Sequence, residues 1–304
     1  MKYKDWLNVW INNYIKPQLK RQTFKKYESI VRLHIMPFLG EYELIDLSAI
    51  ELQKFVGDRI EKGLKSSTVN AIITVLKMSL KAAVETEVVE KQYSDKIRRP
   101  KLIQKQIECF SIEEQKKIES YIIKTHNLKM YGVVIALYTG LRIGELLSIE
   151  WADVDTKRAC IRINKTCYDS WCNGRYVKCV DVPKTLTSIR IIPLPRQIIP
   201  FLKEIKEKTH SKYVIIGKTN EGAQVRSYQH SFEILLKRLG ISHKGFHALR
   251  HTFATRAIEC GVDVKTLSEI MGHKNVEITL NRYAHCFMEH KHEMINRLGK
   301  LLIK

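Results

Sequence analysis

Three cationic side chains share one strip of a predicted helix. In the segment "HALRHTFATRAI", residues 247–258, His247, Arg250 and His251 are spaced i, i+3, i+4 and therefore lie on one face. The opposite face is apolar and suits a protein core. A helix that only packs in a core does not usually gather cations, because like charges repel and desolvation costs free energy. The strip therefore predicts a bound anion or a bound metal ion.

The metal interpretation rests on the spacing of His247 and His251, which matches that of a zinc-binding H-E-x-x-H helix. Position 248 is Ala, however, where such an enzyme needs its general-base glutamate. Arg250 lies between the two histidines and would repel a cation. The strip therefore favours an anion over zinc.

Three other segments carry groups that suit chemistry on a phosphodiester. Arg142 lies in "TGLRIGEL", Lys184 in "VPKTLTSIRIIPL", and His273 and Tyr283 in "MGHKNVEITLNRYAH". Arginines bind the non-bridging oxygens, where negative charge develops during displacement. A lysine can protonate the leaving alkoxide, a histidine can move a proton, and a phenol can attack and hold the phosphate as an ester. No carboxylate cluster for two metal ions is apparent, so we expect chemistry without Mg²⁺ or another cofactor.

The order of these segments resembles the tyrosine recombinase (phage integrase) family over most of residues 110–290. The resemblance implies that Arg142 and Arg250 bind the scissile phosphate. It implies that Lys184 is the general acid for the 5′ oxygen, with Lys178 as the nearby alternative, because the hairpin is the most variable part of the family.

The remaining roles follow from the same resemblance. His247 would assist proton transfer and phosphate binding, and His273 would hydrogen-bond a non-bridging oxygen. Tyr283 would attack, leaving a 3′-phosphotyrosine and a free 5′ hydroxyl. Glu145, one helical turn after Arg142, would help to orient that arginine. His251 is outside this set, and we interpret it as a structural histidine of the helix.

The activity implied is site-specific cutting and rejoining of double-stranded DNA, with four protomers on two sites and an accessory or directionality protein as a further expected partner. Two alternatives stay open: strand relaxation like that of a type IB topoisomerase, and a non-catalytic DNA-binding regulator derived from an integrase. The layout is similar to that of Xer-type or short integrases without an arm-binding domain, since the predicted core-binding helices begin close to residue 1.

The elements that must position these residues are mainly helical. Apolar residues at helical spacing predict four helices within residues 1–97, which resemble a helical, SAM-like core-binding domain. The second of these helices is expected to stop at Pro37 and Gly40. Residues 98–109 are basic and irregular, and we interpret them as a linker. Residues 110–304 would form the catalytic domain.

The catalytic domain is predicted to open with a capping box at Ser111 and Glu114, followed by a buried helix that ends at Gly140. Alternating β-branched residues over 159–194, with an Asn173-Gly174 turn, predict a small antiparallel sheet. The fold class is therefore mainly α with a small antiparallel sheet. Helices return after about Ile198.

The composition favours a polyanionic partner. Lys and Arg number 52 against 32 Asp and Glu, a net charge of +20, which points to nucleic acid before a membrane surface or a merely basic protein. No apolar run appears long enough to span a membrane, and the N-terminus has no signal-peptide pattern. Seven cysteines in such a chain are expected to be reduced thiols in the cytoplasm.

Two features carry no functional assignment. Four cysteines without a C-x-x-C pair are more consistent with packing residues on strands than with a zinc site: Cys160, Cys167, Cys172 and Cys179. Apolar residues after the predicted nucleophile would pack on the same domain or on a neighbouring protomer: Phe287, Met288, Met294, Ile295 and Leu298.

Overall fold

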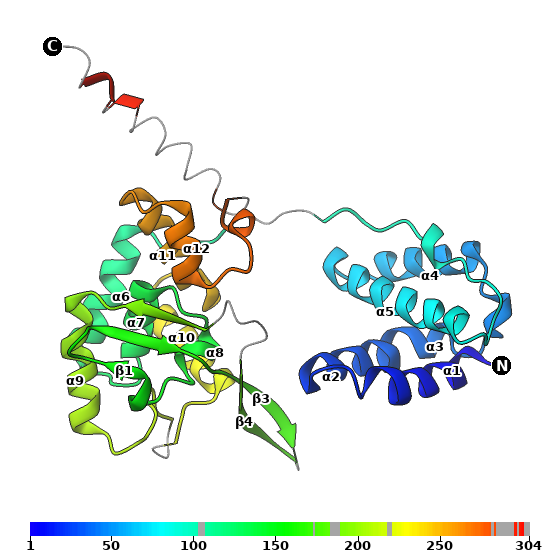
Figure 1. The fold of residues 1–304 in the computed structure, drawn as a ribbon, viewed down its shortest axis with the longest axis horizontal. Helices are drawn as coiled ribbons and strands as arrows, with labels where there is room; N and C mark the ends of the chain where they lie inside the picture. Colours follow the sequence, from blue (N-terminus) through cyan, green and yellow to red (C-terminus); the bar gives the residue numbers. More distant parts are fainter. Residues whose placement is uncertain are drawn as a thin grey trace. The chain divides into compact units, whose positions relative to one another are not determined.

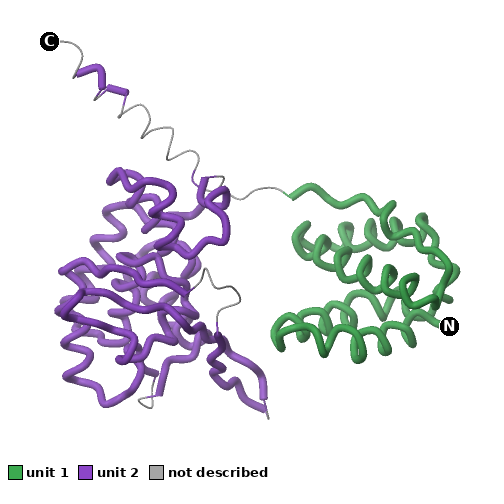
Figure 2. The backbone as a smooth tube through the Cα atoms, viewed as in Figure 1, with its two compact units in different colours: residues 1–105 green, residues 106–304 purple. Residues whose placement is uncertain are grey.

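The computed structural model describes residues 1–102, 107–172, 174–182, 189–217, 221–280, 283, 295–296 and 298–300. The chain forms two compact units, residues 1–105 and 106–304 (Figure 2). Lys184, Phe287, Met288 and Met294 lie outside the described residues. The predicted mainly helical fold with little sheet is confirmed (Figure 1).

The regular elements of the first unit are all helices within its described residues. Its core gathers apolar side chains from all five of its α-helices. The side chain of Trp6 ties the first helix to the longest one by donating to the Ser79 carbonyl at 2.9 Å. The helices are α1 (Tyr3–Val9), α2 (Arg21–Ile30), α3 (Met36–Leu39), α4 (Ala49–Glu61) and α5 (Ser66–Glu85).

The expected stop of the second helix is confirmed at Gly40, which caps its end, but is wrong at Pro37. A π-helical turn over Val31–Ile35 follows α2 directly, and the Met36 N–H donates to the Val31 carbonyl. Pro37 then lies in the first turn of α3, where its missing N–H removes no intrahelical hydrogen bond. The chain therefore stays helical up to Leu39.

Helix α5 also corrects the expectation that no apolar run is long enough to span a membrane. By length and composition its 20 residues could do so. The buried side chains of α5, however, belong to the core of the first unit. A helix in a protein core can have the same length and apolar composition as one that spans a membrane. Its apolar face is accounted for by packing between helices.

The second unit surrounds a larger core with helices and two small sheets. Its helices are α6 (Ile112–Thr125), α7 (Tyr131–Thr139), α8 (Ile143–Leu146), α9 (Ile199–Lys208), α10 (Val225–Arg238), α11 (His247–Glu259) and α12 (Val264–Met271). The predicted capping box is present at the start of α6, where Ser111 accepts from the Glu114 N–H and the Glu114 carboxylate accepts from the Ser111 N–H.

The expected single sheet is two sheets. Strands β1 (Val154–Asp155), β2 (Cys160–Ile163) and β5 (Arg190–Pro193) pair antiparallel in the order β1-β2-β5. Strands β3 (Thr166–Cys172) and β4 (Arg175–Asp181) form a separate hairpin, with Cys172 opposite Arg175 across the predicted two-residue turn. The four clustered cysteines lie on strands β2, β3 and β4, as expected.

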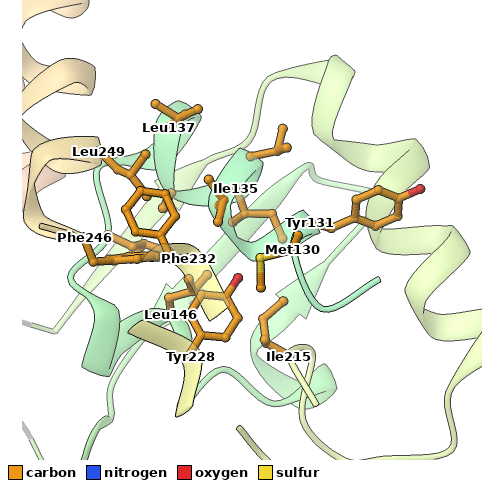
Figure 3. Packing of buried hydrophobic residues seen from close by; sticks show 14 of the residues in the cluster. Met130, Tyr131, Ile135, Leu137, Leu146, Ile215, Tyr228, Phe232, Phe246 and Leu249 are labelled. Atoms are coloured by element: carbon orange, nitrogen blue, oxygen red, sulfur yellow. The ribbon is translucent and has the colours of Figure 1, made fainter. Parts of the chain in front are cut away.

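Helix α7 is the centre of the larger core. All its residues except Tyr138 are buried, and it packs against α11. Phe246, just before α11, meets the rings of Tyr228 and Phe232 of α10 edge-on, at centroid distances of 5.7 and 5.3 Å (Figure 3). This aromatic contact fixes the start of the helix that carries the cationic strip.

Gly140 ends α7 in the left-handed conformation, with φ of +64°. A Cβ there would overlap the ring of Phe253 on α11, whereas a Cβ at Gly240, also at φ +64°, would meet nothing within 4 Å. The close approach of α7 and α11 therefore depends on the absence of a side chain at 140.

We expect Gly140→Ala to lower the free energy of unfolding more than Gly240→Ala. Both variants incur the left-handed strain of about 1–2 kcal/mol, but only Gly140→Ala adds a steric overlap of about 1–3 kcal/mol. Urea unfolding of the two variants measures the difference directly. Equal losses would contradict the proposed close contact with Phe253.

Candidate active site

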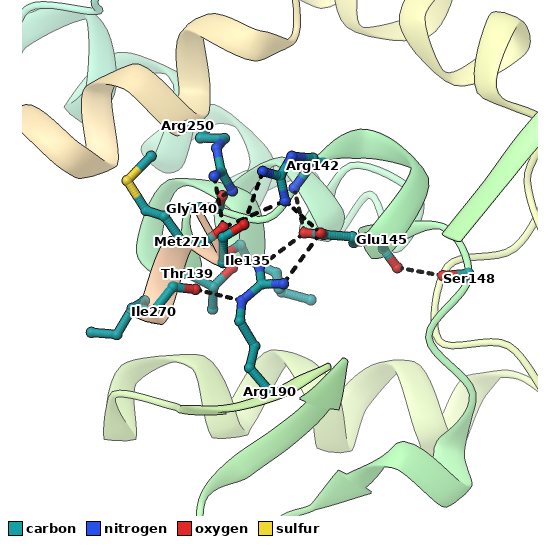
Figure 4. A network of polar contacts seen from close by, with 11 residues as sticks. Ile135, Thr139, Gly140, Arg142, Glu145, Ser148, Arg190, Arg250, Ile270 and Met271 are labelled. Carbon is teal, nitrogen blue, oxygen red and sulfur yellow. Dashed lines mark hydrogen bonds and ion pairs between the residues drawn. The ribbon is translucent and has the colours of Figure 1, made fainter. Parts of the chain in front are cut away.

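Arg250 joins the C-terminal ends of two helices. Its Nη1 donates to the carbonyl of Gly140, at the end of α7, and its Nη2 donates to the carbonyl of Met271, the last residue of α12, both at 2.7 Å (Figure 4). The side chain is only 1% exposed. The last carbonyls of a helix lack intrahelical partners and carry partial negative charge, so they hold a buried guanidinium well.

Arg142 lies beside Arg250 and shares one of its partners. It immediately precedes α8, and its Nη1 donates to Glu145 Oε1 at 2.8 Å and to the Met271 carbonyl at 3.4 Å. The contact between Glu145 and Arg142 that such an orienting role requires is therefore present. Because 38% of the Arg142 side chain is exposed, this guanidinium can meet a phosphate from solvent.

Glu145 is the buried anion of this cluster. Besides Arg142, it accepts from Arg190 of β5, whose Nη1 and Nη2 lie 3.2 and 2.9 Å from the two carboxylate oxygens. Burial alone would raise the pKa of Glu145, but its bonds to Arg190 and the charges of Arg190 and Arg142 outweigh burial and hold the pKa below its usual value.

Arg190 also shapes the turn after α12. Its Nε donates to the Ile270 carbonyl at 2.6 Å, and its guanidinium lies against Gly272, which adopts φ of +61°. A side chain at 272 would collide with this guanidinium. The turn that presents His273 is thus held between Arg190 and the left-handed glycine.

His273 follows this turn directly. Its Nδ1 lies 2.7 Å from Oγ1 of the fully buried Thr279. If the threonine hydroxyl donates, the ring carries its proton on Nε2 and can donate to a phosphate oxygen. The side chain is half-buried, so this second nitrogen is not sealed in the core.

Tyr283 is wholly buried, in contact with a small apolar cluster on α11 and α12 that includes Ala254, Ile258 and Leu267. Its hydroxyl lies 2.7 Å from Nδ1 of His251. The ring of His251 in turn meets the ring of His247 edge-on at a centroid distance of 4.6 Å. Two histidines and the tyrosine therefore form a continuous group along α11.

Arg250 stays charged in its buried position. Burial, with a contribution from the nearby charge of Arg142, lowers the pKa of Arg250 to about 9, so the guanidinium remains charged at neutral pH. Tyr283 is close enough to Arg250 to affect that pKa electrostatically. A phenolate formed at 283 would be stabilised by this charge in return.

Lys178, the alternative to Lys184, is on β4 and is already engaged. Its Nζ donates to the Leu147 carbonyl at 2.7 Å and lies 3.7 Å from the centre of the Tyr213 ring. Burial lowers its pKa. It lines a cavity of about 720 Å³ whose other walls include His210 and Gln224. These contacts give Lys178 a structural role beside the cavity.

Of the residues predicted for the site, Arg142 and Arg250 share the Met271 carbonyl. The charge of Tyr283 affects the pKa of Arg250. His247 contacts the ring of His251, which in turn contacts the Tyr283 hydroxyl. Sequence reasoning missed two members. Arg190 lies in the segment "VPKTLTSIRIIPL". An arginine among the apolar residues of a predicted strand was the available signal that it has a buried partner. His251, which the sequence predicts to be a structural histidine, contacts the Tyr283 hydroxyl, and its position on the cationic strip was the available signal for that contact.

No group of three His, Cys, Asp or Glu side chains within the described part of the chain is arranged to hold a metal ion. Backbone carbonyls and one carboxylate instead hold a cluster of arginines, which is suited to binding phosphate oxygens.

The sequence pattern of the Phage integrase family matches residues 102–290, and that of the phage integrase N-terminal SAM-like domain matches residues 2–58. The chain belongs to the phage integrase family. The resemblance inferred from the active-site segments is therefore confirmed.

Individual relatives agree with this assignment. A protein named Tyrosine recombinase XerC-like, from Caldanaerobacter subterraneus subsp. tengcongensis, is 31% identical over 98% of this chain and 83% of its own length. The solved Tn1549 transposon integrase in complex with transposon right end DNA matches with a TM-score of 0.83, at 22% identity, over 98% of this chain and 100% of that one. A lambda integrase tetramer bound to a Holliday junction gives 0.70, at 19% identity, over 90% and 78%.

This phage integrase is a tyrosine-type site-specific recombinase that acts on DNA. The basic composition and the arginine cluster of the integrase fit that substrate, because a phosphodiester is the anion that the cationic strip of α11 predicts. The small antiparallel sheets and the SAM-like helical unit also match the predicted fold class.

Glu145→Gln is expected to lower the free energy of unfolding at neutral pH by an amount on the order of 3 kcal/mol, since it leaves buried Arg190 without its counter-charge. The ion pairs hold the pKa of Glu145 below 4.5, so their stabilisation is present above pH 4.5 and is lost as the pH falls through the folded-state pKa. Urea unfolding at pH 7, 5 and 3.5 tests this.

The gap between wild type and Glu145→Gln should shrink at the lowest pH. Glu207→Gln, at an exposed position of α9, is the matched control and should show no such gap. A gap that stayed constant down to pH 3.5 would contradict the ion-pair account.

Proposed function

We propose that this integrase cuts and rejoins DNA through a covalent 3′-phosphotyrosine at Tyr283. The observation that carries the proposal is the position of the Tyr283 hydroxyl, which lies 2.7 Å from His251 Nδ1 of α11. The same helix carries Arg250, which shares the Met271 carbonyl with Arg142. A tyrosine hydroxyl held by the helix that carries one of two neighbouring arginines supports this proposal, because phosphoryl transfer needs a nucleophile and cationic groups in one site.

In the proposed cleavage step, Arg142 and Arg250 bind the non-bridging oxygens of the scissile phosphate. The exposed part of Arg142 makes the first contact, and the buried Arg250 supplies charge from below the protein surface. Water is largely excluded around Arg250, so its attraction to the developing oxyanion is strong.

Three further residues complete the proposal. Lys184 protonates the leaving 5′ oxygen, His273 donates to a non-bridging oxygen, and His247, exposed at the start of α11, assists at the phosphate. Lys178 already donates to the Leu147 carbonyl and lies over the Tyr213 ring. These contacts support Lys184, and not Lys178, as the general acid. Rejoining is the reverse attack by a 5′ hydroxyl, which needs no external energy source because the phosphotyrosine keeps the bond energy.

The assembly proposed is a homotetramer on two double-stranded DNA sites, with an accessory or directionality protein as a further partner. The lambda integrase tetramer on a Holliday junction supports the tetramer for a chain of the same fold. We place the reaction in the cytoplasm, where its DNA substrate is found and where cysteines stay reduced.

Covalent capture tests the nucleophile. Wild type is mixed with a library of nicked, randomised duplexes in EDTA and denatured, and the attached DNA is sequenced. Tyr283→Phe should abolish the adducts while leaving DNA binding intact, because only the attacking oxygen is removed. Tyr138→Phe, which removes a half-buried hydroxyl of α7, is the control and should keep them.

Each outcome separates the proposed recombinase from its alternatives. Retarded DNA that never becomes attached to wild type would indicate a binding regulator. Adducts without strand exchange between two sites would indicate relaxation like that of a type IB topoisomerase. Adducts that persist in Tyr283→Phe would exclude Tyr283 as the nucleophile.

Cleavage is expected to proceed unchanged in excess EDTA, because in this proposal side chains supply both the charge and the protons. The yield of covalent adduct should be the same with Mg²⁺ and with EDTA. A strict requirement for a divalent ion would contradict the mechanism, since it would indicate that a metal supplies the charge or the nucleophile.

A further inference from the structure

Tyr283 must lose its phenol proton when it attacks the phosphate, and His251 is in contact with that hydroxyl. A phenol with an ordinary pKa near 10 is ionised to only about one part in a thousand at neutral pH. Tyr283 is completely buried, so bulk water does not reach its hydroxyl to take that proton. Attack by this oxygen therefore needs a group that takes its proton.

We propose that His251 is the general base for Tyr283, accepting the phenol proton at Nδ1 as the hydroxyl oxygen attacks the phosphate. The inference rests on the proposed function and names the residue that activates the nucleophile. Its basis is the distance of 2.7 Å between Nδ1 and the hydroxyl, within the range for direct proton transfer.

The surroundings of His251 suit this role. The side chain is half-buried on α11, so the ring is held in one orientation against Tyr283. The imidazole has an unperturbed pKa near neutrality, which lets it take and return a proton at working pH. The neighbouring Arg250 stabilises the phenolate side of the transfer.

In cleavage and in rejoining, each bond that forms is matched by one that breaks. During cleavage the O–H bond of Tyr283 breaks, the N–H bond at His251 Nδ1 forms, the bond from the tyrosine oxygen to phosphorus forms, and the bond to the 5′ oxygen breaks with a proton supplied by Lys184. During rejoining, the 5′ hydroxyl gives its proton to Lys184 and attacks. The tyrosine oxygen then leaves and takes its proton back from His251.

Lys184 acts on the leaving group and His251 acts on the nucleophile. A substrate with an altered leaving group should therefore rescue a variant of Lys184 but not a variant of His251. A duplex with a 5′-bridging sulfur has a leaving group that needs no acid, since a thiolate is far more stable than an alkoxide. It should restore cleavage by Lys184→Ala. It should not restore cleavage by His251→Asn, in which an amide occupies the region of Nδ1 but cannot take a proton.

The deciding test lowers the pKa of the nucleophile. We would incorporate difluorotyrosine, whose phenol ionises at markedly lower pH, at position 283 and measure single-turnover cleavage. With ordinary tyrosine, His251→Asn should cleave about 10²–10⁴-fold more slowly than wild type. With difluorotyrosine most of that loss should disappear, because the phenol no longer depends on a base.

His243→Asn, at an exposed histidine before α11, is the matched control and should cleave at the wild-type rate with both tyrosines. Thermal unfolding and DNA retardation of His251→Asn show that it folds and binds. If His251→Asn cleaves normally, or stays equally slow with difluorotyrosine, the assignment of the base is overturned. If wild type itself forms no adduct, the proposed function fails instead.

Discussion

The site is organised by arginine side chains that bind the backbone carbonyls at the ends of two helices. Arg250 joins the end of α7 to the end of α12, and Arg142 donates to the same Met271 carbonyl. Those carbonyls need partners wherever a helix ends inside a protein. Here one set of hydrogen bonds satisfies the helix ends and positions the guanidinium groups.

The other features of the site follow from this arrangement. Each helix must end abruptly so that its last carbonyls face the arginines, and each ends at a left-handed glycine, Gly140 or Gly272. Several guanidinium groups in one place repel one another, and the buried carboxylate of Glu145 offsets this repulsion through Arg142 and Arg190. His273 and the segment that carries Tyr283 then follow in the chain after α12.

Local chemistry explains which parts of this structure could be predicted from sequence. The α6 capping box, the end of α7 at Gly140 and the β3–β4 turn depend on residues close together in the chain, and the sequence predicted all three. The continuation through Pro37 was missed because a π-helical turn has no distinct sequence signal.

The contacts that create the site were harder to predict, because they join distant segments. That Arg190 lies against Glu145, 45 residues away, depends on how β5 pairs with β2. That His251 meets Tyr283, 32 residues away, depends on the packing of α11 against α12. The residue types were visible in the sequence, but their partners are set by tertiary packing.

The use of main-chain acceptors has a consequence for how such a site can diverge. A carbonyl oxygen is present whatever side chain the residue carries, so a substitution at Met271 that preserves α12 leaves the acceptor for Arg250 in place. Gly272 cannot be substituted in the same way, because its left-handed conformation and its contact with Arg190 both exclude a side chain. Substitutions around the arginines are therefore expected to be tolerated at positions whose side chains only fill space, while the geometry of the guanidinium groups is set by the backbone.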